Sequence, residues 1–508
     1  MPVNDRSAES QAWVDIWQRI EDCTGNTDTV KSPGPKYLPV LPGHDRHYPL
    51  PNGGTIDQYA DIFLRYAVWL PYSRKVKQGM LGLLFRKPVQ GDGLGLADPH
   101  RNNVTLEGHT LDRFAGIVAS ERLSRGWGGV LVDYSSEAGR PYQRLYSAPS
   151  VLDWRIEYRG GVPWLTQVRV LESFDVPSQD GWSVEKRQQV RVLALAPVPA
   201  VAEQLAADGA TAPDGFGQLS NESDYPLGVY VHQVWRRVVL ENGKEGDTWE
   251  RYGPPVTPMR SGRHLWFVPF AFLARELEAP PLQDVVDLNL AHYRKSADYC
   301  ALMHKFGHPT LLLTGFGSDK DTVRVGGLIR TSATEADGKY IELTGVNARE
   351  LRESMTELKA EMAIVAARML LAEQKKAAET AESQEFRMAG DDATLSAIAL
   401  DVSDTLTQSF VWHRWWTGTE TIERCEAEVD VRLNREFFSR SMSAVELQTF
   451  WLTHLDGGLS RDAYEAIKAR GGLLPDGVTA EEERQLADAS KPAPVEAPMF
   501  GDDGDANA

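Results

Sequence analysis

Residues 280–306 read PPLQDVVDLNLAHYRKSADYCALMHKF, and this stretch does most to decide the fold. Two prolines precede its periodic part, and Gly307 and Pro309 follow it, which are residues that begin and end helices. We therefore expect one long helix over 282–306. Its polar residues are spread around most of the circumference, so we expect it either to bridge through solvent or to pack against its neighbours through small and mixed contacts.

A second long helix is predicted over 347–372. Its apolar residues recur at alternating spacings of four and three, the repeat of a helix that packs along one seam. The seam residues are Leu351, Met355, Leu358, Met362 and Val365. Short strands separated by Gly- and Asp-rich turns are predicted between the two helices, at 310–314, 322–325 and 339–343. A polar, alanine-rich stretch at 373–388 leads into a third helix, predicted over 392–410.

Upstream of 280 the hydrophobic period changes along the chain. Residues 55–125 predict three helical segments, and residues 127–272 predict a mostly antiparallel β region with turns at Gly and Asn. We interpret the Pro- and Gly-rich stretch 27–55 as an extended arm and 197–227 as an inserted loop. Downstream of the third helix, a strand is expected at 426–433. The fold class predicted from these patterns is α+β.

Composition excludes several classes of protein. The chain has 508 residues and a formal net charge of −18, which does not suit a protein that wraps nucleic acid on a basic face. Its three cysteines lie far apart and predict neither a disulfide framework nor a zinc site. No apolar run approaches the roughly 20 residues that span a bilayer, so we expect a soluble protein without a membrane partner.

Several motifs invite a chemical interpretation. GDGLG at 91–95 is like half of a phosphate-binding loop, but it lacks the following Lys and Ser or Thr, so we favour a structural loop. Asp133 ends a predicted strand, as metal-binding aspartates do in nucleotide enzymes, yet no glycine-rich loop precedes it. We favour a structural role there as well. The sequence predicts no catalytic residue, no metal site and no cofactor.

Five stretches together resemble the portal proteins of tailed bacteriophages, the head-to-tail connectors, in a subfamily catalogued as a domain of unknown function. They are YLPVLPG at 37–43, LGLLFRKP at 81–88, GGVLVDY at 128–134, the helix at 280–299, and Glu379-Thr-Ala381 with Arg387. The likeness covers about 37–470 in the expected order.

The resemblance implies a portal architecture with a helical and β wing, a two-helix stem, a small β clip, a tunnel loop with a long helix behind it, and a helical crown. The implied boundaries are 1–36 N-terminal arm, 37–281 wing, 282–307 first stem helix, 308–346 clip, 347–372 second stem helix, 373–391 tunnel loop, 392–440 long helix and return to the wing, 441–490 crown, and 491–508 disordered acidic tail.

The resemblance also implies a function. Copies of the chain would form a ring, expected to be a dodecamer, at one capsid vertex of the virion, after assembly in the host cytoplasm. Double-stranded DNA would be packaged and ejected through it. The terminase large subunit and later the adaptor or neck proteins would bind the clip, beside major capsid and scaffolding proteins. An acidic channel wall would keep DNA from adhering as it slides.

The residues expected to carry these roles follow from the same resemblance. The DNA-channel residues would be Lys375, Lys376, Gln384 and Arg387, and the terminase-docking residues Lys320, Arg324 and Arg330, while the seam residues would pack the stem. Two other classes stay open: another phage head or neck protein, such as a minor head or adaptor protein, and an enzyme whose site is built from scattered residues.

Overall fold

The computed structural model divides into two compact units, Met1–Arg435 and Glu436–Ala508. The residues that it describes all lie in the first unit. They are 2–42, 46–49, 54–96, 98–177, 182–210, 227–239, 245–306, 310–314, 322–323, 329–330, 335, 337–341, 346–370 and 393–435.

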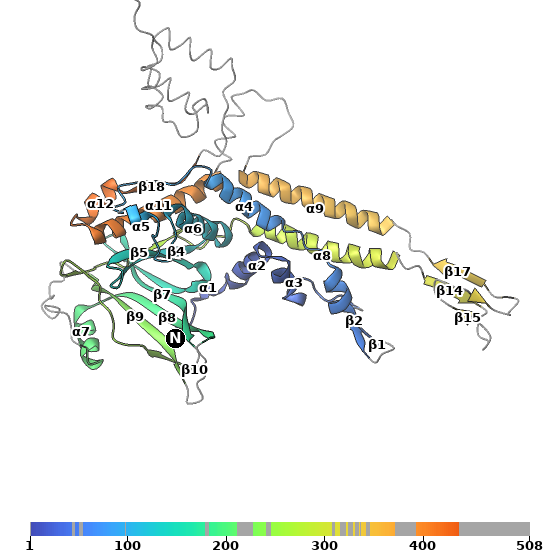
Figure 1. Ribbon diagram of the computed structural model, residues 1–508, viewed down its shortest axis with the longest axis horizontal. Helices are drawn as coiled ribbons and strands as arrows, with labels where there is room; N and C mark the ends of the chain where they lie inside the picture. Colours follow the sequence, from blue (N-terminus) through green and yellow to red (C-terminus); the bar gives the residue numbers. More distant parts are fainter. Residues whose placement is uncertain are drawn as a thin grey trace, which may run out of the picture. The chain divides into compact units, whose positions relative to one another are not determined.

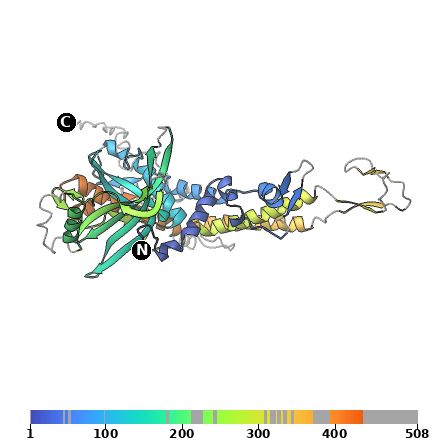
Figure 2. The ribbon, with the colours of Figure 1, turned by 90° about the horizontal axis from the view of Figure 1, so that it is seen from below.

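Two antiparallel sheets of three and five strands form the largest β part of this unit (Figures 1 and 2). The first has the order β13-β4-β5, with β4 (Gly128–Ser135), β5 (Arg140–Ser147) and β13 (Phe270–Phe272). The second has the order β10-β9-β8-β7-β6, with β6 (Val151–Arg159), β7 (Val162–Pro177), β8 (Val184–Ala196), β9 (Val229–Val239) and β10 (Glu245–Arg251). The antiparallel β region predicted over 127–272 is confirmed, although β5 had not been predicted.

Helices α6 (Leu111–Arg125) and α11 (Ala393–Thr417) pack on the three-stranded sheet and on each other. Thr110 caps the start of α6 by accepting a hydrogen bond from Arg113 N, and Gly126 ends the helix with a left-handed φ of 71°. Phe114 of α6 and Phe410 of α11 are buried in the resulting core. The predicted third helix therefore exists and extends seven residues beyond its expected end at 410.

The first 36 residues are folded onto the unit, and the expected extended conformation of 27–36 is wrong. They form α1 (Ala8–Gln11), α2 (Val14–Thr24), α3 (Thr27–Lys31) and the 3-10 helix η1 (Gly34–Lys36). Asn26 caps α3 by accepting from Thr29 N, which starts a helix despite the prolines downstream. Trp17, Ile20 and Cys23 of α2 are fully buried.

Two further expectations are corrected. Within the predicted loop 197–227, α7 (Val198–Ala207) is helical because Val201 and Leu205, one turn apart, pack against Val229 and Val231 of β9. Residues 426–433 were expected to be a strand, but α12 (Ile422–Glu428) precedes the short strand β18 (Asp430–Arg432).

The remaining short elements connect these parts. They are β1 (His47–Pro49), β2 (Thr55–Asp57), the π-helix η2 (Gln58–Leu64), α4 (Tyr72–Leu84), β3 (Gln90–Asp92), α5 (Asp98–Arg101), β11 (Met259–Arg260) and β12 (Arg263–His264). The first two of the three helical segments predicted within 55–125 correspond to η2 and α4.

Two long helices follow the β region, as predicted. Helices α8 (Gln283–Phe306) and α9 (Val346–Leu370) lie side by side and run in opposite directions (Figures 1 and 2). Between them in sequence come β14 (Thr310–Thr314), β15 (Thr322–Val323), β16 (Ile329–Arg330) and β17 (Asp337–Ile341). Strand β14 pairs with β17 and β15 pairs with β16, both antiparallel.

Candidate functional site: the paired helices and the strands between them

Three polar residues of α8, Asn289, His292 and Ser296, are buried by this chain itself. The side chains of Asn289 and His292 have exposed fractions of 0 % and 2 %, although polar side chains of a helix usually face solvent. The Asn289 carboxamide accepts hydrogen bonds from Ser73 N at 3.1 Å and Ser73 Oγ at 2.9 Å, and its Nδ2 donates to Leu70 O at 3.0 Å. Because each polar atom of this side chain is satisfied, its burial costs little.

The N-terminal segment completes this cover. Arg19 of α2 forms an ion pair with Asp287 at 3.4 Å, and Arg294 of α8 donates to Tyr37 O at 3.0 Å. Of the two alternatives that the sequence left open for this helix, packing against neighbouring elements therefore holds at Asn289 and His292, while Asp287 and Arg294 stay exposed. The cause is that α2, α4 and η2, which are distant in sequence, pack against α8.

Helix α9 lies beside α8, and its seam residues are less exposed than most positions between them. Met362 is buried, and the other four seam residues are half-buried, whereas most positions between them are exposed. Lys295 of α8 donates a hydrogen bond to Ser354 of α9. His292 lies in the same contact region, and burial, followed by the positive charge of Lys359, lowers its pKa. The seam thus faces the body of the unit; its role in assembly stays a prediction.

The residues expected to touch DNA or terminase are not brought together by the described structure. Lys375, Lys376, Gln384 and Arg387 lie outside the described residues, as do Lys320 and Arg324. Arg330 is the last residue of β16, where it pairs with Thr322 of β15. These assignments stay predictions.

Asp133 has a structural partner, as the sequence favoured. Its carboxylate forms an ion pair with Arg191 of β8 at 2.5 Å, and both side chains are about nine-tenths buried between the two sheets. Burial alone would raise the pKa of Asp133, but the Arg191 guanidinium, His232 and the Tyr134 backbone N–H together outweigh it, and the pKa is lowered. Because a buried charge that loses its partner is strongly destabilising, this pair ties the sheets together.

The GDGLG loop packs against α11 and α12. Arg414 of α11 donates to Gly93 O at 2.8 Å, and its guanidinium also pairs with Glu420 and Glu428. Gly93 has a φ of 63°, and a Cβ there would overlap the backbone oxygen of Glu428. Packing against Glu428 and Arg414 therefore requires glycine at position 93. The sequence alone did not identify Arg414 as a neighbour of this loop.

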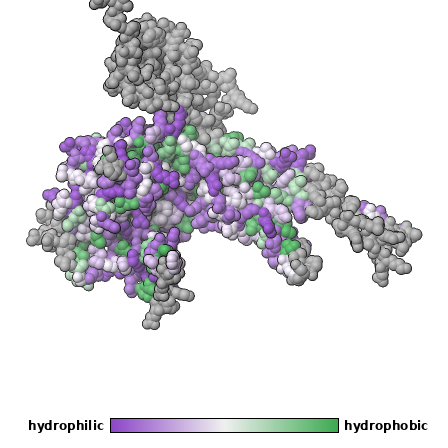
Figure 3. Space-filling model, viewed as in Figure 1, coloured by the Kyte–Doolittle hydropathy of each residue, from purple (hydrophilic) through white to green (hydrophobic). Residues whose placement is uncertain are grey.

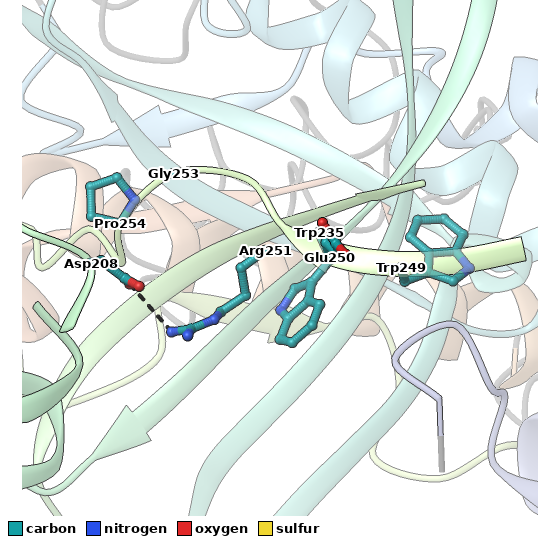
Figure 4. Close-up of a pocket in the computed structure, with 7 residues that line it drawn as sticks. All are labelled: Asp208, Trp235, Trp249, Glu250, Arg251, Gly253 and Pro254. Atoms are coloured by element: carbon teal, nitrogen blue, oxygen red, sulfur yellow. Dashed lines mark hydrogen bonds and ion pairs between the residues drawn. The ribbon is translucent and has the colours of Figure 1, made fainter. Parts of the chain in front are cut away.

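An open pocket of about 500 Å³ lies at the β10 edge of the five-stranded sheet (Figure 4). Arg251 pairs with Asp208 at 3.3 Å, and the Arg237 guanidinium lies 5.3 Å from the Trp249 ring centre. The seven lining residues include no His, Cys, Ser or Thr. They offer stacking surfaces and hydrogen bonds, without a nucleophile beside a base.

The described surface offers few other chemical features. In the described part of the chain, no three His, Cys, Asp or Glu side chains are placed to hold a metal ion. None of the helices among these residues combines the length and the hydropathy needed to cross a bilayer. On the face shown in Figure 3, hydrophilic residues predominate and hydrophobic residues form small separate groups.

Comparison with known proteins places the paired helices inside a recognised family segment. The family model described as "Domain of unknown function (DUF4055)" matches residues 281–417, from just before α8 to the end of α11. No curated protein matches the chain. Among solved structures, a chain of "Virion of native gene transfer agent (GTA) particle" is 10 % identical, with 81 % of this chain and 93 % of that chain covered and a TM-score of 0.38. A TM-score of this size does not establish a shared fold.

Proposed function

We propose that this protein is a structural component of the virion of a tailed bacteriophage or phage-like particle, and that it is the portal subunit. Its copies form a ring at one capsid vertex, expected to be a dodecamer, through which double-stranded DNA is packaged and ejected. The terminase large subunit, and later adaptor or neck proteins, bind the segment between α8 and α9. Major capsid and scaffolding proteins surround the ring, which assembles in the host cytoplasm.

The observation that carries the proposal is the order and packing of three long helices. Helices α8 and α9 have 24 and 25 residues, lie side by side, and are separated in sequence by short strands. Helix α11, of 25 residues, then returns across the three-stranded sheet. The resemblance to portal proteins implies this succession of stem helix, clip, stem helix and long helix, and the family match covers the same residues.

The charge of the chain supports the same role. A net charge of −18 per copy gives a ring a strongly acidic character. A conduit benefits from such a field because phosphates are repelled from the wall and DNA can slide.

The decisive experiment examines the purified full-length protein by negative-stain electron microscopy and by light scattering. We expect closed rings with a central hole, and we expect these rings to capture the terminase large subunit in a pull-down. Monomers or open filaments under all conditions would contradict the proposal. Rings that never capture terminase would instead favour an adaptor or another neck protein.

A further inference from the structure

Helix α4 lies in a stretch whose charge is opposite to that of the whole chain. Between Asp61 and Asp92 the sequence contains no Asp or Glu, whereas the chain as a whole carries a net charge of −18. The basic residues of this interval are Arg65, Arg74, Lys75, Lys77, Arg86 and Lys87. An uninterrupted positive stretch in an acidic protein indicates either internal neutralisation or an anionic partner.

Internal neutralisation accounts for part of this charge only. Lys77 is half-buried close to Glu21 and Glu121, and Arg74 donates to Thr24 O at 3.4 Å. Lys75, by contrast, is exposed, and no acidic side chain among the described residues forms an ion pair with it. Its positive charge therefore faces outward from α4.

The exposed side of α4 carries the positive charge of Lys75, and the space beside its two glycines is empty. Lys75, Gln78, Gly79 and Gly82 are exposed and lie on one side of the helix, because their spacing is three or four residues. Nothing lies within 4 Å of the position that a Cβ would take at either glycine. Each glycine inside a helix costs up to about 1 kcal/mol relative to alanine, and packing within the described chain does not offset that cost. A flat surface of this kind lets another backbone approach closely.

The position of α4 relates this face to the DNA path that the proposed function requires. Helix α4 contacts both α9 and α11. Figure 1 shows the end of α9 and the beginning of α11 beside α4. The segment expected to line the DNA channel thus leaves and re-enters the described structure next to α4.

We propose that the exposed face of α4, centred on Lys75, Gly79 and Gly82, binds the phosphate backbone of double-stranded DNA. The inference rests on the proposed function, which brings DNA through the ring. The Lys75 ammonium supplies charge, the Gln78 amide can donate to a phosphate oxygen, and the glycines allow close approach. Such contacts position DNA without reading its sequence, as passage of a whole genome requires.

The test is a fluorescence-anisotropy titration of a short labelled DNA duplex with the purified full-length protein at several salt concentrations. Lys75→Glu should weaken binding several-fold and should lower the slope of log affinity against log salt by about 1. Lys186→Glu, which makes the same charge change at an exposed position on β8, should leave both quantities unchanged. Lys75→Arg should retain binding, and Gly82→Gln should weaken it by adding bulk to the open face.

The outcomes separate this inference from the proposed function. Normal rings of Lys75→Glu that bind the duplex as wild type does would overturn the inference and leave the portal role intact. Loss of rings in Lys75→Glu with duplex binding unchanged would show that the face contacts protein instead of DNA, which also overturns it. Wild-type protein that forms no rings would contradict the portal role, while the titration would still decide whether α4 binds DNA.

Discussion

Position 93 requires glycine for two reasons: its backbone is left-handed, and a Cβ there would overlap Glu428. An experiment can separate the two effects. The φ of 63° at Gly93 is almost the same as the φ of 64° at Gly139, but only Gly93 has a neighbour in the way of a Cβ. Gly139→Ala should therefore lower the free energy of unfolding by about 1 kcal/mol through backbone strain alone. Gly93→Ala should cost about 3 kcal/mol, because Glu428 must also move.

Chemical denaturation of the two variants beside wild type measures this difference. Equal losses for Gly93→Ala and Gly139→Ala would show that the contact with Glu428 contributes nothing. The comparison also tests our interpretation of the loop, since a phosphate-binding role would leave Gly93→Ala with only the backbone-strain loss that Gly139→Ala shows.

At the scale of elements, we predict that the α8–α9 contact depends on the seam of α9. Leu358 is a half-buried seam residue, whereas Ile364, on the same helix, is half exposed at 50 %. Leu358→Asp would place a carboxylate against apolar side chains and should lower the free energy of unfolding by about 2–3 kcal/mol. Ile364→Asp, the matched control, should change it by at most about 0.5 kcal/mol.

Thermal unfolding measures stability for both variants, and light scattering measures ring size. We expect Leu358→Asp to reduce or abolish rings because the two helices separate. If Leu358→Asp formed rings of wild-type size with wild-type stability, the seam would not be the packing face of α9.

At the scale of the whole molecule, buried histidines should make the protein sensitive to acid. Burial lowers the pKa of His413 to about 3 and that of His232 to about 4, and it also lowers the pKa of His264 and His292. In the unfolded chain these side chains titrate near 6.5. The unfolded state therefore binds more protons than the folded state below pH 6.5, and stability falls as pH decreases from there toward 4.

The melting temperature measured between pH 7.5 and 5 checks this expectation. Through His413 alone, the free energy of unfolding should fall by roughly 2 kcal/mol between pH 6.5 and 5. The melting temperature of His413→Leu should therefore decrease less steeply with falling pH than that of wild type. His47→Leu, at an exposed position, should keep the wild-type slope. Parallel pH profiles for wild type and His413→Leu would contradict the assignment of His413 as a neutral buried group.

The sequence by itself determined the succession of elements. Helices α6, α8, α9 and α11 and most antiparallel strands of the two sheets, though not β5, were predicted because hydrophobic period, prolines and glycines act within a few residues. The seam of α9 was proposed for the same reason, since one repeat of four and three residues specifies one helical face, and its part in packing stays a prediction. The residues expected to contact DNA and terminase came from a resemblance, and Arg330 alone among them lies in the described part of the chain.

Only the tertiary structure decided what covers α8 and why certain residues are required. Asn289 is satisfied by Ser73, which lies 216 positions away in the sequence, and Gly93 is required by Arg414 and Glu428, more than 300 positions away. The folding of the first 36 residues onto the unit and the helical state of α7 likewise depend on partners distant in the chain. Such contacts leave no local period in the sequence, because the partner's position is set by the path of the whole chain and not by neighbouring residues.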